Sequence, residues 1–245
     1  MGIIFHIGRY TRFILRVFRK PENGPVFRRS LVNEMTTIGT NSVGIVTLLS
    51  LFMGAVMCLQ TAHQVSGWIP AYTIGFTVRQ TMILEFSPTL IPVILAGKIG
   101  SNIASQLGTM RVTEQIDALE IMGINSAGFL TLPKILAGII CLPLLVIMSM
   151  FLGLASGAGI AYVTGVSSMA DFQYGLQVDF VSYDVIYALI KTTIFSIIIT
   201  SVSAYHGYHT HGGALEVAKS STKAVVYSVV IIMMSNLILT KLLLT

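Results

Sequence analysis

Two ionisable residues, Glu85 and Lys191, stand in stretches of the sequence that are otherwise almost entirely apolar. A charged side chain within a membrane span is costly unless it faces a water-filled cavity or a partner, so such residues commonly have a function. Lys191 follows Asp184 by seven residues, which places both on nearly the same face of a helix. A lysine can also extend to the head groups, which is harder for the shorter glutamate. We therefore expect Glu85 to line a substrate path and leave both alternatives open for Lys191.

The other candidates for chemistry are weaker. His206, His209 and His211 form an HxxHxH cluster that could bind a metal, but no acidic or Cys ligand adjoins it, which favours a polar loop. The segment Ala96–Ile99 contains a Gly-Lys pair but lacks the first Gly and the following Ser or Thr of an ATP-binding loop. No Ser–His–Asp set, HExxH pair or membrane carboxylate pair indicates an enzyme. We expect no enzymatic activity, metal or cofactor on this chain; any ATP would be hydrolysed elsewhere.

A short charged segment, Val112–Met122, follows the stretch that contains Glu85. Its apolar residues recur at helical spacing, and its acidic residues lie away from them. Eleven residues rise roughly 16 Å, about half of a bilayer core. We predict a surface helix that inserts into a partner, with acidic residues suited to its N-terminus and a stop at Gly123.

The elements that must position these residues follow from the composition. The 245 residues are 54% hydrophobic and only 10% charged, whereas ordinary soluble domains carry about 25% charged residues. We predict an all-α integral membrane protein with a single membrane domain over residues 1–245. It has five transmembrane helices, at 42–62, 82–105, 135–163, 185–205 and 224–244.

Two of these spans contain features that affect packing. Pro88 and Pro92 remove backbone donors and should bend the second span, which lipid tolerates only where protein or water satisfies the freed carbonyls. Small residues predict a face for close helix packing in the third span: Gly153, Gly157 and the nearby Ala155, Ser156 and Gly159. Hydroxyl residues of the fourth span predict hydrogen bonds between helices: Thr192, Thr193, Ser196, Thr200 and Ser201.

The first twenty residues predict an amphipathic helix at the membrane interface. Its arginines share one helical face: Arg9, Arg12, Arg16 and Arg19. A solvated arm that binds an acidic partner is the alternative. Basic residues gather in this arm, in Lys98–Lys134 and in His206–Lys223, which places the N-terminus in the cytoplasm and the C-terminus outside. This asymmetry explains the net charge of +5 without nucleic acid. Arg79 is assigned to an outside loop, near the interfacial anchors Trp68 and Tyr72.

The run EFSPTLIPVILAGKIGSNIASQLGTMRVTEQIDALEIMGI (Glu85–Ile124) closely resembles the signature of MlaE-like permeases. The similarity extends to Thr37–Gln60, Leu132–Leu145 and His206–Val226, and so covers nearly the whole chain. It implies a permease subunit of an ABC transporter that moves phospholipids between the two membranes of Gram-negative bacteria. The implied assembly is a homodimer in the inner membrane with two cytoplasmic ATPases, which hold ATP-Mg, and a ring of periplasmic MCE-domain proteins. A small STAS-type regulator often joins the ATPase.

The resemblance also implies roles for individual residues. The short helix would be a coupling helix that contacts the ATPase through Arg111, Glu114, Gln115, Asp117 and Leu119. The lipid cavity or its mouth would be lined by Gln60, Glu85, Pro88 and Lys191.

This chain departs from the common pattern beside the cavity. Leu84 stands where an Arg is usual, so a lipid phosphate would be held differently. The alternative is a self-contained, ion-coupled carrier or channel with Glu85 and Lys191 on an ion path. That function would predict paired charges within the membrane and internal repeats, neither of which is evident in the sequence. A membrane enzyme acting on lipids would need more than the HxxHxH cluster.

Overall fold

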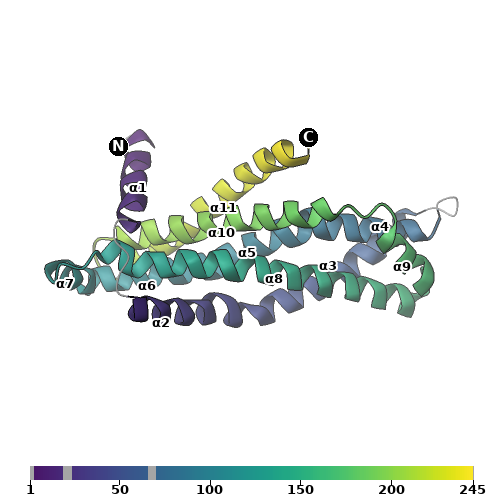
Figure 1. Cartoon of the computed structure of the whole chain (residues 1–245), viewed down its shortest axis with the longest axis horizontal. Coiled ribbons are helices and arrows are strands. Elements are labelled where there is room, and N and C mark those ends of the chain that lie inside the picture. The colour runs from purple at the N-terminus through teal and green to yellow at the C-terminus, as the bar shows by residue number, and fades with distance from the viewer. Residues whose placement is uncertain (1–2, 19–23, 66–69, 245) are drawn as a thin grey trace. The chain divides into compact units, whose positions relative to one another are not determined.

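The computed structural model describes residues 3–18, 24–65 and 70–244, and no strand occurs among them. The elements, shown in Figure 1, are α1 (Ile3–Val17), α2 (Gly24–Met35), η1 (Thr36–Thr40), α3 (Asn41–Gln64), α4 (Tyr72–Thr81), η2 (Met82–Leu90), α5 (Ile91–Leu95), η3 (Ala96–Gly100), α6 (Ser101–Val112), α7 (Gln115–Ile121), α8 (Ser126–Thr164), α9 (Met169–Gln177), α10 (Ser182–Tyr208) and α11 (Ala214–Leu244). The η elements are π-helical turns within longer helices. The predicted all-α class is confirmed.

Within the described residues, five continuous helical stretches are long and apolar enough to cross a membrane: Gly24–Gln64, Tyr72–Val112, Ser126–Thr164, Ser182–Tyr208 and Ala214–Leu243. The first two have 41 residues each and so rise about 60 Å, twice the thickness of a bilayer core. Their ends therefore extend beyond the hydrocarbon. This is why each helix is longer than the apolar span predicted within it.

The chain forms two compact units. Unit 1 comprises residues 1–41, 93–141 and 194–245, and unit 2 comprises residues 42–92 and 142–193. Helices α8 and α10 contribute a part to each unit without a break. Within unit 1, α1 runs across the direction of α6, as an interfacial helix does relative to a span (Figure 1).

Close backbone approach organises unit 2. A Cβ atom added to Gly54 on α3 would lie 1.9 Å from the carbonyl oxygen of Gly153 on α8, so the two helices touch through their backbones. This contact confirms the predicted role of Gly153. Gly157 lies near the same place, because its Cβ would be 3.3 Å from the carbonyl oxygen of Gly54. Gly159 was wrongly predicted to share this face, since a Cβ there would meet nothing within 4 Å.

The segment between Thr164 and Asp184 has acidic residues but no Lys or Arg, which predicts an outside loop, and the structure places helix α9 within it. Ser168 caps the N-terminus of α9: its Oγ accepts a hydrogen bond from the Asp171 N–H at 3.0 Å and donates to the Asp171 carboxylate at 2.6 Å. Phe172 of α9 is fully buried in the core of unit 2. The sequence Ser-x-x-Asp is a capping signal, so this helix could have been found.

Arg79 is not in a loop, contrary to the prediction, but buried in α4. Its guanidinium donates hydrogen bonds to the carbonyl groups of Leu176, Val178 and Asp179 at 2.9, 2.7 and 3.2 Å. Those carbonyl groups belong to the C-terminal end of α9, where a cation also suits the helix dipole. Arg79 therefore fixes α9 against α4. Trp68, predicted as an anchor nearby, lies outside the described residues.

A buried ion pair joins three helices of unit 1. Lys134 of α8 donates hydrogen bonds to Glu34 of α2 at 2.5 Å and to Gln106 of α6 at 2.6 Å.

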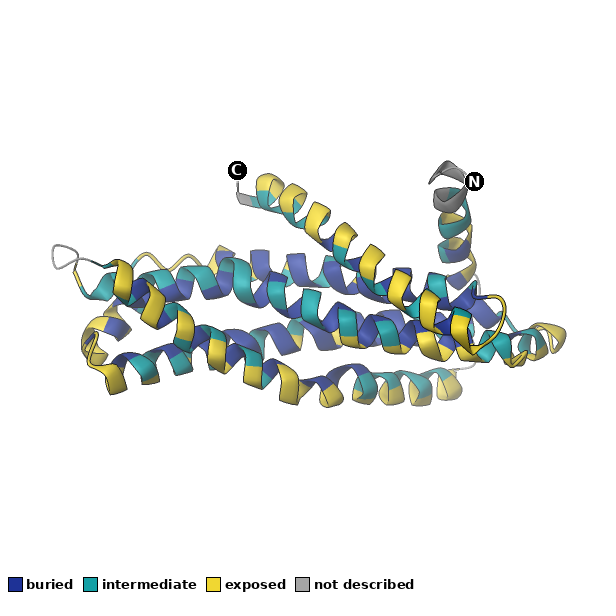
Figure 2. Cartoon of the chain, turned by 180° about the vertical axis from the view of Figure 1, so that it is seen from behind, coloured by how far each residue is buried: buried dark blue, intermediate teal, exposed yellow. Residues whose placement is uncertain are grey.

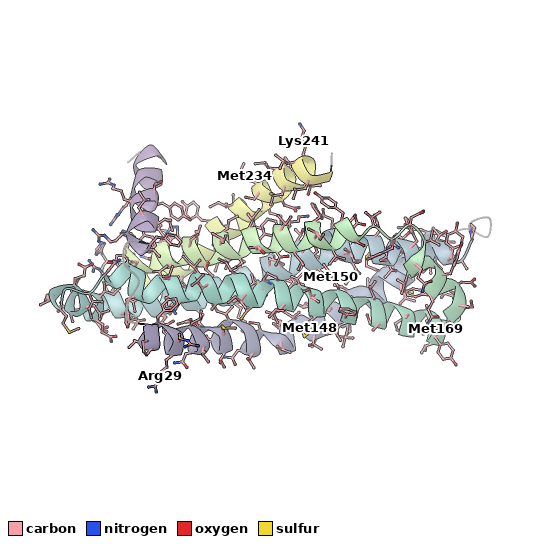
Figure 3. The ribbon with its side chains drawn as sticks, in the orientation of Figure 1. Arg29, Met148, Met150, Met169, Met234 and Lys241 are labelled. Carbon is pink, nitrogen blue, oxygen red and sulfur yellow. The ribbon has the colours of Figure 1, made fainter. Side chains whose placement is uncertain are left out.

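Helix α11 is mostly uncovered. Only 11% of its most apolar window is buried, and Figure 2 shows exposed residues along much of this helix. Met234 of α11 and Arg29 of α2 project away from their helices (Figure 3). Such a surface is suited to lipid or to a second chain.

Candidate functional site

Glu85 and Lys191 form an ion pair inside unit 2. The Lys191 Nζ donates hydrogen bonds to Glu85 Oε1 at 3.1 Å, to the Tyr187 hydroxyl at 3.0 Å and to the Leu84 carbonyl oxygen at 3.3 Å. The Lys191 side chain is fully buried, so the alternative in which it extends to the head groups is wrong. The expectation that the chain lacks paired intramembrane charges is also wrong.

Proline explains why Lys191 finds a backbone acceptor. In a regular α-helix the carbonyl of Leu84 would accept a hydrogen bond from the N–H of residue 88, and Pro88 has no N–H. The helix responds with the π-helical stretch η2, in which Pro88 is buried, and Lys191 donates to the Leu84 carbonyl. The predicted distortion is thus present, and Lys191 gives the Leu84 carbonyl a donor from outside its own helix.

The carboxylate of Glu85 is only partly enclosed. Its side chain remains 47% exposed, although Thr89 donates a hydrogen bond to Oε2 at 3.1 Å. An ionised carboxylate on a membrane helix needs water, protein or a polar ligand on its open side. Gln60 lies exposed on α3 and makes no hydrogen bond to this pair within the described part of the chain. The structure therefore brings Glu85, Pro88 and Lys191 together.

The short charged helix is shorter than predicted. Helix α6 continues through Val112, and α7 begins only at Gln115. Glu114 between them adopts a left-handed conformation, with φ 60° and ψ 12°, which turns the chain and separates the two helices. The predicted stop is confirmed, since Gly123 has a φ of +77° and its N–H bonds to the Glu120 carbonyl at 3.0 Å.

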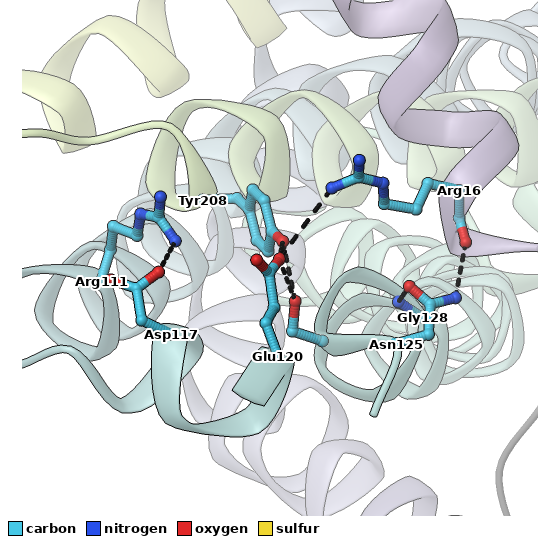
Figure 4. A network of polar contacts seen from close by, with 8 residues as sticks. Arg16, Arg111, Asp117, Glu120, Asn125, Gly128 and Tyr208 are labelled. Carbon is cyan, nitrogen blue, oxygen red and sulfur yellow. Dashed lines mark hydrogen bonds and ion pairs between the residues drawn. The ribbon is translucent and has the colours of Figure 1, made fainter. Parts of the chain in front are cut away.

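Polar contacts hold α7 in unit 1 (Figure 4). Arg111 donates to the Asp117 carboxylate at 2.6 Å. Glu120, which the sequence analysis did not assign to the site, accepts hydrogen bonds from the Tyr208 hydroxyl at 2.8 Å and from Ser126 Oγ at 3.0 Å. The bond from Tyr208 lowers the pKa of Glu120, and burial only partly opposes this. Glu120 therefore stays ionised and ties α7 to α8 and α10.

The outer face of α7 combines acidic, polar and apolar groups. Glu114 and Gln115 are exposed, and Ile121 and Met122 are 88% and 65% exposed. Ile116 is buried and Leu119 half-buried, so they attach the helix to its own chain. A helix tip with two large apolar side chains uncovered is suited to insertion into a partner.

Two histidines of the HxxHxH cluster make contacts within unit 1. The Nδ1 of His209 donates to the Tyr205 carbonyl at 2.9 Å, and the His206 ring stacks on Tyr227 with centroids 5.2 Å apart. Burial lowers the pKa of His209 to about 4. Among the described residues, no three His, Cys, Asp or Glu side chains are placed to share a metal ion.

The hydroxyl residues of α10 mostly bond within their own helix, contrary to the prediction. Thr192, Thr193 and Thr200 donate to carbonyl groups four residues earlier. Ser201 alone of the predicted set is bonded to another helix, through the Tyr10 hydroxyl of α1 at 2.7 Å. Ser196 is buried without a hydrogen-bond partner within the described chain.

The fold and the site together define a multi-pass membrane protein with a charged pair inside a proline-distorted helix. Residues 31–242 match the family described as Permease MlaE. The Rickettsia bellii protein named "Probable ABC transporter permease protein" is 33% identical over 96% of this chain and 91% of its own length. A Synechocystis protein with a name of the same kind is 33% identical over 91% of this chain and 85% of its own length. The Arabidopsis thaliana protein TRIGALACTOSYLDIACYLGLYCEROL 1, chloroplastic, is 29% identical over 92% of this chain and 63% of its own length. The chain belongs to the MlaE permease family and is a transmembrane permease subunit.

Proposed function

We propose that the chain moves phospholipids between the inner and outer membranes as one subunit of an ABC transporter, driven by a separate ATPase. The observation that carries this proposal is the half-exposed Glu85 beside the fully buried Lys191. Membership of the family and the permease names of the relatives support it. The chain would lie in the bacterial inner membrane, with its N-terminus in the cytoplasm and its C-terminus in the periplasm.

The chemistry of the pair fits a phospholipid head group. Lys191 offers a cation to a phosphate, and Glu85 offers an acceptor to an ammonium or hydroxyl group. Leu84 adds no second cation here, so an arriving phosphate would compete with Glu85 for Lys191. Such an exchange makes binding weak enough to be reversible, as transport requires. The cavity itself would form between two copies of the chain.

The coupling to ATP would pass through α7. Because Arg111 already holds Asp117, the groups left for the ATPase are Glu114, Gln115 and the apolar tip at Ile121. Arg111 and Leu119 would support the helix from its inner side. ATP-Mg would reside on the partner, and MCE-domain and STAS-domain proteins would complete the assembly. The chain needs neither a cofactor nor nucleic acid for this function.

A second function, a self-contained ion-coupled carrier, is favoured by one observation. Glu85 and Lys191 are a pair of charges in contact within helices able to span the membrane. A carrier would transport without ATP or a partner chain, whereas the permease would need both.

The experiment is co-purification from the native host followed by reconstitution in liposomes with fluorescent phospholipid. We expect an ATPase to co-purify and ATP to drive lipid movement. Glu114→Lys should reduce the amount of co-purified ATPase and the rate of ATP-driven lipid movement by about tenfold, because it reverses a charge at the exposed start of α7. Glu216→Lys is the matched control: the Glu216 side chain is 44% exposed and pairs with Lys219 at the start of α11. Lipid movement without ATP, or equal loss in both variants, would contradict the proposal.

A further inference from the structure

An open pocket of about 390 Å³ lies beside α1 in unit 1. It is lined by Arg9, Arg12, Phe13, Arg16, Tyr208 and His209. The three arginines are spaced three and four residues apart, so they lie along one side of α1 over roughly 10 Å. A pocket of this size accommodates a small polar group such as a lipid head group.

The pocket contains positive charge that its own chain does not neutralise. Within the described part of the chain, Arg9 and Arg12 form no ion pair. Arg16 has a carboxylate only at 3.9 Å, that of Glu120. His209 is neutral near pH 7 and adds no charge. A concentrated positive charge beside an aromatic floor attracts an anion that accepts several hydrogen bonds, and a phosphate does so best.

The position of the pocket indicates where such a phosphate would come from. Tyr208 ends α10, whose 27 residues rise about 40 Å against about 30 Å for a bilayer core, so an end of this helix reaches the head-group layer. Leu15 of α1 and Phe18 directly after it are 66% and 61% exposed, as expected of a helix that dips into the interface. Lipid phosphates occupy this level of a bilayer.

We propose that this pocket binds the phosphate of an anionic phospholipid from the leaflet in which α1 lies. The site is separate from the Glu85–Lys191 pair, which belongs to unit 2. Arg9 and Arg12 hold the phosphate from α1, and Phe13 and Tyr208, with ring centroids 5.2 Å apart, form the floor. The bound lipid anchors α1 to the membrane by a specific contact as well as by its apolar side chains.

Arg16 connects this pocket to α7. Its guanidinium faces Glu120, and its carbonyl oxygen accepts a hydrogen bond from the Asn125 side chain at 2.8 Å (Figure 4). A lipid phosphate that draws Arg16 toward the pocket weakens the contact with Glu120 and loosens α7. This consequence, unlike the binding itself, rests on the proposed coupling role of α7.

The test is native mass spectrometry of the full chain, with any partners that co-purify, released from nanodiscs of phosphatidylglycerol or phosphatidylcholine. We expect one phosphatidylglycerol to persist per chain and about tenfold less retention in Arg9→Gln/Arg12→Gln. Arg28→Gln/Arg29→Gln removes the same charge from exposed positions on α2 and should retain the lipid. Arg9→Lys/Arg12→Lys should give an intermediate value, because lysine cannot form a bidentate contact.

Several outcomes would overturn the site. Equal losses in both glutamine variants would mean unspecific attraction. Displacement by inorganic phosphate would mean an anion site with no lipid, and loss of a partner protein in place of the lipid would mean a protein-binding arm. Loss of the lipid in Lys191→Met would place it at the Glu85 site. None of these measurements requires transport, so failure of the proposed function would leave the result interpretable.

Discussion

Lys191 is the residue whose environment differs most from its appearance in the sequence. It neutralises Glu85, and it donates to the Leu84 carbonyl that faces Pro88. The two partners of the ion pair are unequally enclosed, since Lys191 is fully buried and Glu85 is 47% exposed. Replacement of Glu85 and replacement of Lys191 should therefore destabilise the protein to different degrees.

We predict that Glu85→Gln destabilises the protein more than Lys191→Met. The first variant strands a buried cation, at a cost of about 3 kcal/mol, whereas the second leaves a carboxylate that water can reach, at about 1 kcal/mol. Thermal unfolding in detergent measures both. The double variant should be no less stable than Glu85→Gln alone, because the pair is then gone. Additive losses, or a shift equal to that of the exposed control Lys223→Met, would contradict this account.

The burial of His209 predicts that its contacts with neighbouring aromatic rings are weakened by acid. It packs against the rings of Phe13, Tyr205 and Tyr208 and is near the charges of Arg9, Arg111 and His211. Its pKa is about 4 in the folded chain and about 6.5 when unfolded, so its contribution is complete above pH 6.5 and declines toward pH 4.

The expected result is a fall in unfolding temperature from pH 6.5 to pH 4 that His209→Gln removes. Glu120 acts in a lower window, because its folded pKa lies below the usual 4.5, so its contribution is lost only as the pH falls below that value. Glu120→Gln should leave the slope between pH 6.5 and 4.5 intact. An unchanged slope in His209→Gln would refute the assignment to this residue.

At the scale of elements, glycine controls how closely α3 and α8 approach. We predict that Gly54→Ala costs about 1–3 kcal/mol, because its Cβ would lie 1.9 Å from the Gly153 carbonyl oxygen and backbone must move. Gly159→Ala on α8 is the matched control. Its Cβ would meet nothing within 4 Å, so the alanine should be neutral or stabilising by up to about 1 kcal/mol. Equal shifts in unfolding temperature would disprove a contact that depends on Gly54.

The helices themselves were largely predictable, because the length and apolar character of the spans leave few alternatives. Pro88 also allowed the distortion of the second span to be predicted, although its π-helical form was not. Apolar runs do not reveal helix α9, whose indication in the sequence is the capping signal at Ser168. Arg79 was assigned to a loop for the same reason: a lone cation beside a span suggests solvent unless its carbonyl partners, about 100 residues away, are known.

At the scale of the whole molecule, the distribution of basic residues along the chain predicts which segments are cytoplasmic but not which charged residues form ion pairs. Lys134 belongs to a segment predicted to be cytoplasmic, and it contacts Glu34, 100 residues earlier. Glu85 and Lys191 are 106 residues apart. Neither pair leaves a periodic pattern, so both depend on the tertiary fold. Family membership was predictable because the run from Glu85 to Ile124 is so specific, and the match over residues 31–242 confirms it.

The burial of both cysteines has a practical consequence for following this protein at work. Cys58 and Cys141 are free thiols, 0% and 6% exposed, so a water-soluble maleimide should spare both while the helices remain packed. A single cysteine introduced at Ile121, which is 88% exposed, would then accept a fluorophore without removal of any native thiol. Because the native cysteines would remain unlabelled, fluorescence from this position would report the contact of the α7 tip with a partner.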